Sequence, residues 1–114
     1  MELVVYSLNN CYYSEGACKY LDDLKKIYRK ISINNNDKSY YKKKNNMNLF
    51  PQIFLENKTN NIKINIGGFD DLKNIHEIIK NNKLYDDVYE KLDNMLDLKR
   101  KHILQIIKFF LNNI

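Results

Sequence analysis

Apolar residues along the chain follow two spacings, one typical of strands and one typical of helices. Glu2–Ser7 (ELVVYS) is a short apolar run rich in β-branched residues, which predicts a buried strand. From about Tyr12 to Tyr28 the apolar side chains recur every three or four positions, which predicts a helix. Lys30–Asn34 then alternates between apolar and polar residues. The chain is therefore expected to begin with a strand, a helix and a second strand.

The second part of the chain predicts two more strands and further helices. Asn35–Asn48 is polar and weakly patterned, so it predicts at most a short helix. Leu49–Glu56 (LFPQIFLE) is an apolar strand entered through the only proline, and Ile62–Ile66 alternates cleanly as its hairpin partner. A glycine pair and two acidic residues then open a helix that runs to about Lys80. A long helical pattern covers Leu84–Asn112.

This order of elements predicts one mixed sheet. Two strands joined through a helix should be parallel, and two strands joined by a tight turn should be antiparallel. We therefore expect an α/β protein of the thioredoxin-like fold, with a four-stranded mixed sheet flanked by helices and an added C-terminal helix. The expected core covers residues 1–82, and a C-terminal helical segment, residues 83–114, packs on or extends the same domain. A homodimer contact is the alternative role for the end of that segment.

Composition narrows the class of protein. A chain of 114 residues with 44% hydrophobic content suits a single folded domain. The first residues lack the pattern of a signal peptide, and no apolar run is long enough to span a membrane, so a cytoplasmic protein without a membrane partner is expected. The net charge of +5 is modest. The basic, aromatic segment Lys38–Asn46 (KSYYKKKNN) favours a solvated surface over a nucleic-acid site, and no nucleic-acid partner is expected.

Two cysteines are the candidates for chemistry. Cys11 follows a strand and opens a helix, where backbone N–H groups and the helix dipole favour the thiolate. The residue three positions later, where a second thiol would suit a redox motif, is Ser14. Cys18 lies about 10 Å further along the helix, too far for a disulfide with Cys11. A buried structural thiol is favoured for Cys18 over a resolving or regulatory one. His76 and His102 lack neighbours at metal-ligand spacing, so no metal site is expected.

Three separated stretches resemble the glutaredoxin family in order and spacing. They are VVYSLNNCYYSEGACKYL with the thiol, LFPQIFLE with the proline-entered strand, and INIGGFDDL with the glycine pair. The resemblance implies a glutathione-dependent oxidoreductase that reduces glutathione mixed disulfides through one catalytic thiol, Cys11. It implies a cis proline facing the thiol, and glutathione and glutathionylated proteins as partners. Tyr12 and Ser14 become active-site neighbours. The glutathione-binding residues that it implies are Tyr13, Phe50, Pro51, Gly68, Phe69, Asp70 and Asp71.

The chain departs from the family pattern at informative positions. The family carries Cys-Pro-Tyr-Cys or Cys-Gly-Phe-Ser, whereas this chain has Cys11-Tyr12-Tyr13-Ser14. Leu8 replaces a lysine that supports the thiolate and the glycine carboxylate of glutathione in the family, and Met47 replaces an Arg or Gln. The resemblance therefore implies weaker glutathione binding. One of the lysines of the adjoining segment is a candidate substitute for these contacts: Lys42, Lys43 or Lys44.

Two other functions remain open at this point. Single-thiol relatives bind a two-iron cluster between two subunits, and Cys11 would be the iron–sulfur ligand in that case. The third reading is a redox-silent interaction module that retains the fold and binds through its C-terminal helix. Asp70 and Asp71 also have an alternative, since acidic residues suit the start of any helix.

Overall fold

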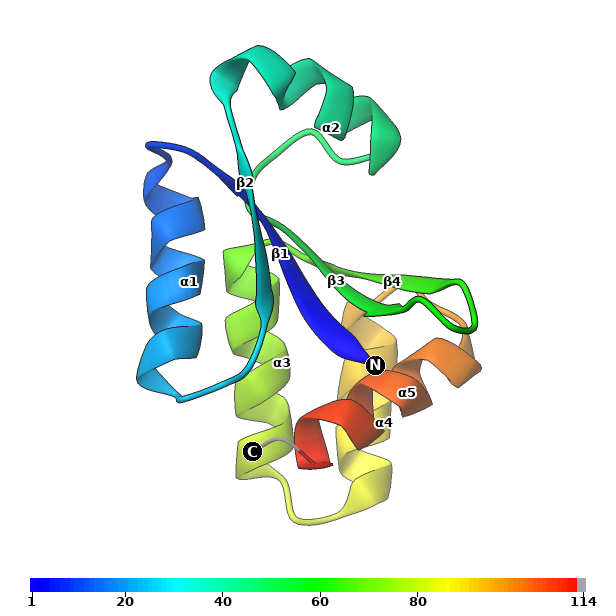
Figure 1. Ribbon diagram of the computed structural model, residues 1–114. Helices are drawn as coiled ribbons and strands as arrows, with labels where there is room; N and C mark the ends of the chain where they lie inside the picture. The colour runs from blue at the N-terminus through cyan, green and yellow to red at the C-terminus, as the bar shows by residue number, and fades with distance from the viewer. Residues whose placement is uncertain (113–114) are drawn as a thin grey trace. The chain divides into compact units, whose positions relative to one another are not determined.

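The computed structural model describes residues 1–112, in which strands and helices follow one another in the predicted order (Figure 1). The elements are β1 (Glu2–Leu8), α1 (Tyr12–Asp23), β2 (Arg29–Ile33), the short 3₁₀ helix η1 (Asn35–Asp37), α2 (Lys38–Lys44), β3 (Gln52–Asn57), β4 (Ile62–Gly67), α3 (Phe69–Asn81), α4 (Tyr85–Met95) and α5 (Arg100–Asn112).

The strands form one mixed sheet in the order β2-β1-β3-β4. β1 and β2 are parallel, with Tyr6 opposite Ile31. The reason is that α1 returns the chain to the end of the sheet at which β1 started, before β2 begins. β3 is antiparallel to both of its neighbours, β1 and β4. The predicted parallel pair, antiparallel pair and four-stranded mixed sheet are confirmed.

The chain divides into two compact units, Met1–Leu72 and a second unit that starts at Lys73. The first contains the whole sheet with α1 and α2, and α3 crosses the division. The second contains the remainder of α3 with α4 and α5. The expected core of residues 1–82 and segment of residues 83–114 stay predictions, and the last two residues of that segment, Asn113 and Ile114, lie outside the described residues.

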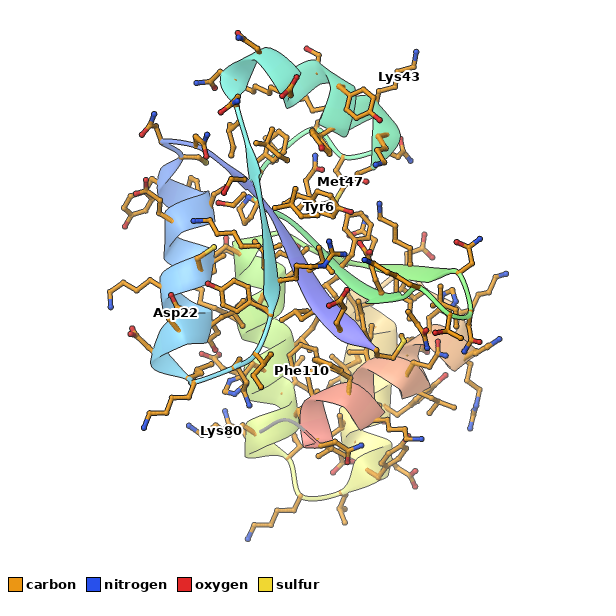
Figure 2. All side chains as sticks on the ribbon, in the orientation of Figure 1. Tyr6, Asp22, Lys43, Met47, Lys80 and Phe110 are labelled. Atoms are coloured by element: carbon orange, nitrogen blue, oxygen red, sulfur yellow. The ribbon has the colours of Figure 1, made fainter. Side chains whose placement is uncertain are left out.

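One face of the sheet is covered by α2 and the segment that follows it. Six buried side chains form a cluster here, which we call the α2-face cluster: Val4, Tyr6, Leu8, Ile33, Phe50 and Phe54. Tyr41 of α2, Met47 and Cys11 pack against it. Figure 2 shows Tyr6 and Met47 between α2 and the sheet, whereas Lys43 projects from the outer side of α2. The strand alternation produces this cluster, since every second residue of β1 points to the same face.

The opposite face of the sheet is covered by α1 (Figure 1). Leu3 and Val5 of β1 point to this side, between the residues that face α2, and both are buried. Helix α1 buries one stripe, formed by Ser14, Ala17, Cys18 and Leu21. The burial that was predicted for Cys18 is confirmed, with 7% of the residue exposed.

Helix α1 ends earlier than the sequence predicted. Its last residue is Asp23 rather than Tyr28, because Lys25 adopts a left-handed backbone with φ of 57°. The N–H of Lys25 donates to the carbonyl of Asp22, and the N–H of Lys26 donates to the carbonyl of Leu21. These two bonds form a Schellman motif, which usually has glycine or asparagine at the left-handed position. A lysine in that position gives no sequence signal, so the prediction was wrong there.

The long helical pattern from Leu84 also resolves differently, into α4 and α5. Leu96 follows α4 with extended backbone, φ −106° and ψ 132°. A single continuous helix would place Lys99 and Arg100 on its apolar stripe, three and four positions after Leu96. Breaking the helix avoids this burial, and α5 starts a new stripe that contains Ile103 and Ile107, both fully buried. Over residues 1–112 no helix combines the length and the apolar character that crossing a membrane requires.

Candidate functional site

Cys11 occupies the position between β1 and α1 that the sequence predicted. It is the N-cap residue of α1, with extended backbone (φ −106°, ψ 121°), and its carbonyl accepts the first helical hydrogen bond from Glu15 N–H at 2.9 Å. Its side chain makes no capping hydrogen bond and is half-buried against the α2-face cluster. The thiol is therefore held at the N-terminal end of α1.

Ser14, which stands where a second thiol would be, is a structural residue. It is fully buried, and its Oγ accepts a hydrogen bond from Leu8 N–H at 3.1 Å. This contact ties the first turn of α1 to the end of β1. The thiol turn, Cys11–Ser14, is thus fastened at both ends by bonds between residues close in sequence.

The two tyrosines of the thiol turn are open to solvent. Tyr12 is 81% exposed and Tyr13 is 58% exposed. Their rings meet edge to face with centroids 5.5 Å apart. Because neither ring contributes to the core, both are available to a bound partner.

A cleft of about 590 Å³ lies in the first unit beside the thiol turn. It brings together residues from three separate parts of the chain: Tyr13, Met47, Asn48, Leu49, Phe50, Pro51, Gly67, Gly68, Phe69, Asp70 and Asp71. All seven residues that the resemblance named for glutathione are among them. Cys11 and Tyr12 are not lining residues. Cys11 packs against the α2-face cluster, to which the lining residue Phe50 belongs.

One wall of the cleft is the segment Met47–Pro51, which we call the cleft wall. It has no regular secondary structure, and the Phe50–Pro51 peptide bond is cis, as the resemblance implied. The N–H of Met47 donates to the carbonyl of Lys42 at 3.1 Å, and the side-chain amide of Gln52 donates to the carbonyl of Met47 at 3.1 Å. Met47, the first residue of the wall, is thus bonded both to Lys42 of α2 and to the side chain of Gln52, the first residue of β3.

The opposite side of the cleft is the turn from β4 into α3. Gly67 has φ of 111°, and a side chain there would collide with the Asp71 carboxylate. That carboxylate accepts a hydrogen bond from Gly68 N–H at 2.9 Å. Asp71 therefore has the helix-start role that its position suggested. Asp70 is exposed at the same helix end.

Phe69 fixes the distance of this turn from α1. A Cβ on Gly16 would lie only 2.7 Å from the Phe69 ring, so the absence of a side chain at Gly16 makes room for that ring. Tyr20, one turn further along α1, meets Phe69 edge to face with centroids 5.9 Å apart. Gly16 thus allows Phe69 to pack closely on α1 while lining the cleft.

The cleft carries no basic side chain among its lining residues within the described chain. Leu8, at the position of the family lysine, is buried in the α2-face cluster and is 8% exposed. Met47 lines the cleft with a neutral thioether. Asp70 and Asp71 are the charged lining residues, so the cleft offers acidic groups rather than cations to a ligand.

Other groups in the described part of the chain contribute no evident metal chemistry. Cys11 and Cys18 are both free thiols. No three His, Cys, Asp or Glu side chains within residues 1–112 gather as a metal site would require.

Sequence reasoning did not find the residues that support the cleft. Gln52 is fully buried in an otherwise apolar stretch of β3, and Asn45, also buried, donates to its side-chain oxygen. A polar residue directly after Pro51 was the available signal for Gln52. Asn45 stands in a polar segment where nothing distinguishes it, and Gly16 is one of three glycines. Among the lining residues, Asn48 and Leu49 were not predicted.

Comparison with known proteins identifies the fold and the family of this chain. The family model for glutaredoxin matches residues 3–59. Glutaredoxin 1 of Rickettsia typhi is 32% identical over 79 residues, which cover 66% of this chain and 70% of that protein. A crystal structure of a buckwheat glutaredoxin–glutathione complex superimposes with a TM-score of 0.52 at 22% identity, covering 77% of this chain and 76% of the other.

The structural match confirms the expected thioredoxin-like fold. The family match spans β1, the thiol turn, the cleft wall and β3, which are the elements that position Cys11 and one side of the cleft. The sequence relationship extends over more than two thirds of the bacterial relative. The chain belongs to the glutaredoxin family, whose members are thiol–disulfide oxidoreductases.

Proposed function

We propose that this protein reduces glutathione mixed disulfides through the single thiol of Cys11. The observation that carries the proposal is the cleft: it gathers Tyr13, Phe50, Pro51 and the Gly68–Asp71 turn beside a cysteine at a helix N-terminus. Glutathione takes part in this reaction as a substrate.

In the first step the Cys11 thiolate attacks the glutathionyl sulfur of a modified protein or small thiol. A disulfide forms between Cys11 and glutathione, and the disulfide to the substrate breaks. The substrate sulfur leaves with the electron pair as a thiolate and is reduced. Cys11 is the N-cap residue of α1, so its side chain lies at the N-terminal end of that helix.

In the second step a free glutathione thiolate attacks the glutathionyl sulfur on Cys11. Oxidised glutathione is released, and the Cys11 thiolate returns. No second protein thiol takes part, so Ser14 is compatible with the cycle. Because Ser14 carries no thiol and Cys18 is buried on α1, reduction of protein disulfides by a two-cysteine route should be weak or absent.

The cleft offers complementary groups to the peptide groups of glutathione and to its γ-glutamyl end. The peptide groups of the cleft wall around Phe50 can pair with the tripeptide as an added strand does. The γ-glutamyl end carries a carboxylate and an ammonium group. The N-terminal turn of α3 suits the carboxylate, and the acidic residues Asp70 and Asp71 suit the ammonium.

The cleft offers fewer complementary groups to the glycine carboxylate of glutathione. Leu8 and Met47 supply no charge, and Lys43 projects from the outer side of α2 (Figure 2). We expect glutathione to bind more weakly than it would with a lysine at position 8. We place the reaction in the cytoplasm, where thiols stay reduced.

Turnover of a glutathionylated peptide by wild type, Cys11→Ser and Cys18→Ser tests the proposal. We expect Cys11→Ser to fall to the uncatalysed rate, because the attacking sulfur is gone. Cys18→Ser is the matched control, and it should keep wild-type turnover as long as it folds.

Equal rates for wild type and Cys11→Ser, or no turnover by wild type, would contradict the proposal. In the second case anaerobic purification with glutathione separates the remaining readings. A brown, glutathione-dependent dimer would identify an iron–sulfur carrier, and a colourless protein without glutathione binding would identify an interaction module.

A further inference from the structure

A series of side-chain hydrogen bonds runs beneath the cleft wall, from β4 to the wall itself. Lys63 Nζ donates to Asn45 Oδ1 at 2.6 Å, and Asn45 Nδ2 donates to Gln52 Oε1 at 2.8 Å. Gln52 Nε2 then donates to the carbonyl of Met47 at 3.1 Å. We call Lys63, Asn45 and Gln52 the amide bridge. Its three residues come from separate segments of the first unit: Asn45 follows α2, Gln52 begins β3, and Lys63 lies in β4.

The amide bridge has only one self-consistent direction. Gln52 must present its NH₂ group to the Met47 carbonyl, so its oxygen faces Asn45. Asn45 must then present its own NH₂ group to Gln52, which leaves its oxygen for Lys63. An ammonium group has donors and no acceptor, so Lys63 fixes this direction from its end. Bonds aligned in this way polarise and strengthen one another.

The two amides have no alternative partner in water. Gln52 is fully buried and Asn45 is 7% exposed. A buried amide that loses its partner is costly, so the amide bridge is strongly favoured once the fold forms.

Two aromatic rings hold the ammonium group of Lys63 in place. Its Nζ lies 4.6 Å from the centroid of the Phe54 ring and 5.0 Å from that of Tyr6. Both rings belong to the α2-face cluster. Burial is the main influence on this group and lowers the pKa of Lys63. The position of Lys63 is therefore set by the core rather than by solvent, although the residue as a whole is exposed.

We propose that Lys63 acts as a positioning residue for the cleft wall, through Asn45 and Gln52. The wall lacks regular secondary structure, so its backbone is ordered by the two bonds of its first residue, Met47, to Lys42 and to Gln52. The amide bridge supplies the second of these bonds. On the proposed function, this order keeps the peptide groups at Phe50 ready for glutathione, so the bridge acts on binding and leaves the chemistry at Cys11 unchanged.

Lys63→Met tests this proposal, because methionine keeps the unbranched apolar stem on the rings and removes the donor. We expect faster amide hydrogen exchange at Met47, whose N–H donates to the carbonyl of Lys42. We also expect KM for a glutathionylated peptide to rise about fivefold, the loss of one hydrogen bond, with kcat within about twofold of wild type. Lys58→Met is the control for charge, since Lys58 lies exposed in the β3–β4 turn. It should change neither readout.

Asn45→Asp separates the amide bridge from simple ring packing. Aspartate still accepts from Lys63 and keeps the volume, but it cannot donate to Gln52. Exchange at the Met47 amide should increase, although Lys63 and the rings are unchanged. Exchange rates that stay at the wild-type level in folded Lys63→Met or folded Asn45→Asp would overturn the proposal.

The two readouts keep this proposal distinct from the proposed function. If wild type does not turn over the peptide, the function fails, and the exchange rates still decide whether the bridge orders the wall. If turnover is normal and KM of Lys63→Met equals that of wild type, the role in binding is wrong.

Discussion

The thiol turn and the cleft wall border the same cleft but are held in different ways. The thiol turn, Cys11–Ser14, is secured by the start of α1 and by one serine that bonds the end of β1. All of these groups lie within a few residues of one another. The cleft wall, Met47–Pro51, is secured from β3, α2 and β4 through the amide bridge.

This difference separates two requirements of the proposed reaction. The reactive sulfur needs a fixed position close to partial positive charge. The backbone of a helix N-terminus provides such a position by itself. The binding surface needs backbone peptide groups that are free to bond a ligand, which neither a helix nor the interior of a sheet provides. Side chains from elsewhere in the fold must then order it. Variants on each side should show the contrast, from the largest expected effect to the smallest.

The largest effect is expected at the turn that faces the cleft wall. Gly67→Ala should destabilise the protein by about 2 kcal/mol or more, because φ of 111° disfavours a side chain. The new Cβ would also displace the Asp71 carboxylate from Gly68 N–H. Urea unfolding measures the loss. Gly68→Ala is the control, since the nearest atom to its Cβ is the Pro51 carbonyl oxygen at 3.8 Å. Equal stability of the two variants would contradict this explanation.

Ser14→Ala tests the local fastening of the thiol turn. The N–H of Leu8 would lose its partner in a buried site, which costs about 1–3 kcal/mol. Ser39→Ala, at an exposed position in α2, should stay within about 0.5 kcal/mol of wild type. Denaturant midpoints of the two variants compare them directly. A loss no larger for Ser14→Ala than for Ser39→Ala would show that this bond does not hold the turn.

Met47→Arg, at a lining position of the cleft, should strengthen glutathione binding by roughly fivefold, the effect of about 1 kcal/mol from one charged hydrogen bond. The reason is that the cleft lacks a basic lining residue. Isothermal titration with glutathione and with its glycine ethyl ester checks the cause. The gain should appear with glutathione and disappear with the ester, whose carboxylate is masked. A gain of equal size for both ligands would point to another cause.

The smallest effect concerns Tyr6, below the cleft wall. Burial, followed by the Glu56 carboxylate, raises the pKa of Tyr6 to about 12. A raised pKa stabilises the fold fully below pH 10 and loses that contribution as pH rises through about 12. Tyr6→Phe should therefore make stability less dependent on pH between these values. Tyr28 has the same sign, so part of the dependence remains. Tyr40→Phe, at an exposed position, should behave as wild type does.

Much of the fold could be predicted because it depends on local patterns. The alternation in β1 and the hairpin of β3 and β4 required only the side-chain period of a strand. The end of α1 could not be predicted, because Lys25 takes a backbone conformation for which lysine gives no signal. The break between α4 and α5 was missed because no proline or glycine marks it.

The residues of the candidate site also fall into a group that local motifs predicted and a group that they did not. The thiol turn, the cis proline and the Gly68–Asp71 turn were predicted from motifs, and one cleft is lined by Tyr13, Pro51 and the Gly68–Asp71 turn. The amide bridge was not predicted, because Lys63, Asn45 and Gln52 are ordinary polar residues until the strands bring them together. Ser14 was noted for the thiol that it lacks, whereas the structure shows the bond that it makes.

The sequence by itself determined the order of the elements, the placement of Cys11 at a helix start and the family of the chain. These depend on residues close together, where spacing and backbone preference suffice. Only the tertiary structure decided how the cleft wall is ordered and which side chains support it. The reason is that a buried polar group needs a partner at hydrogen-bond distance, and the register of β3 and β4 fixes which groups meet.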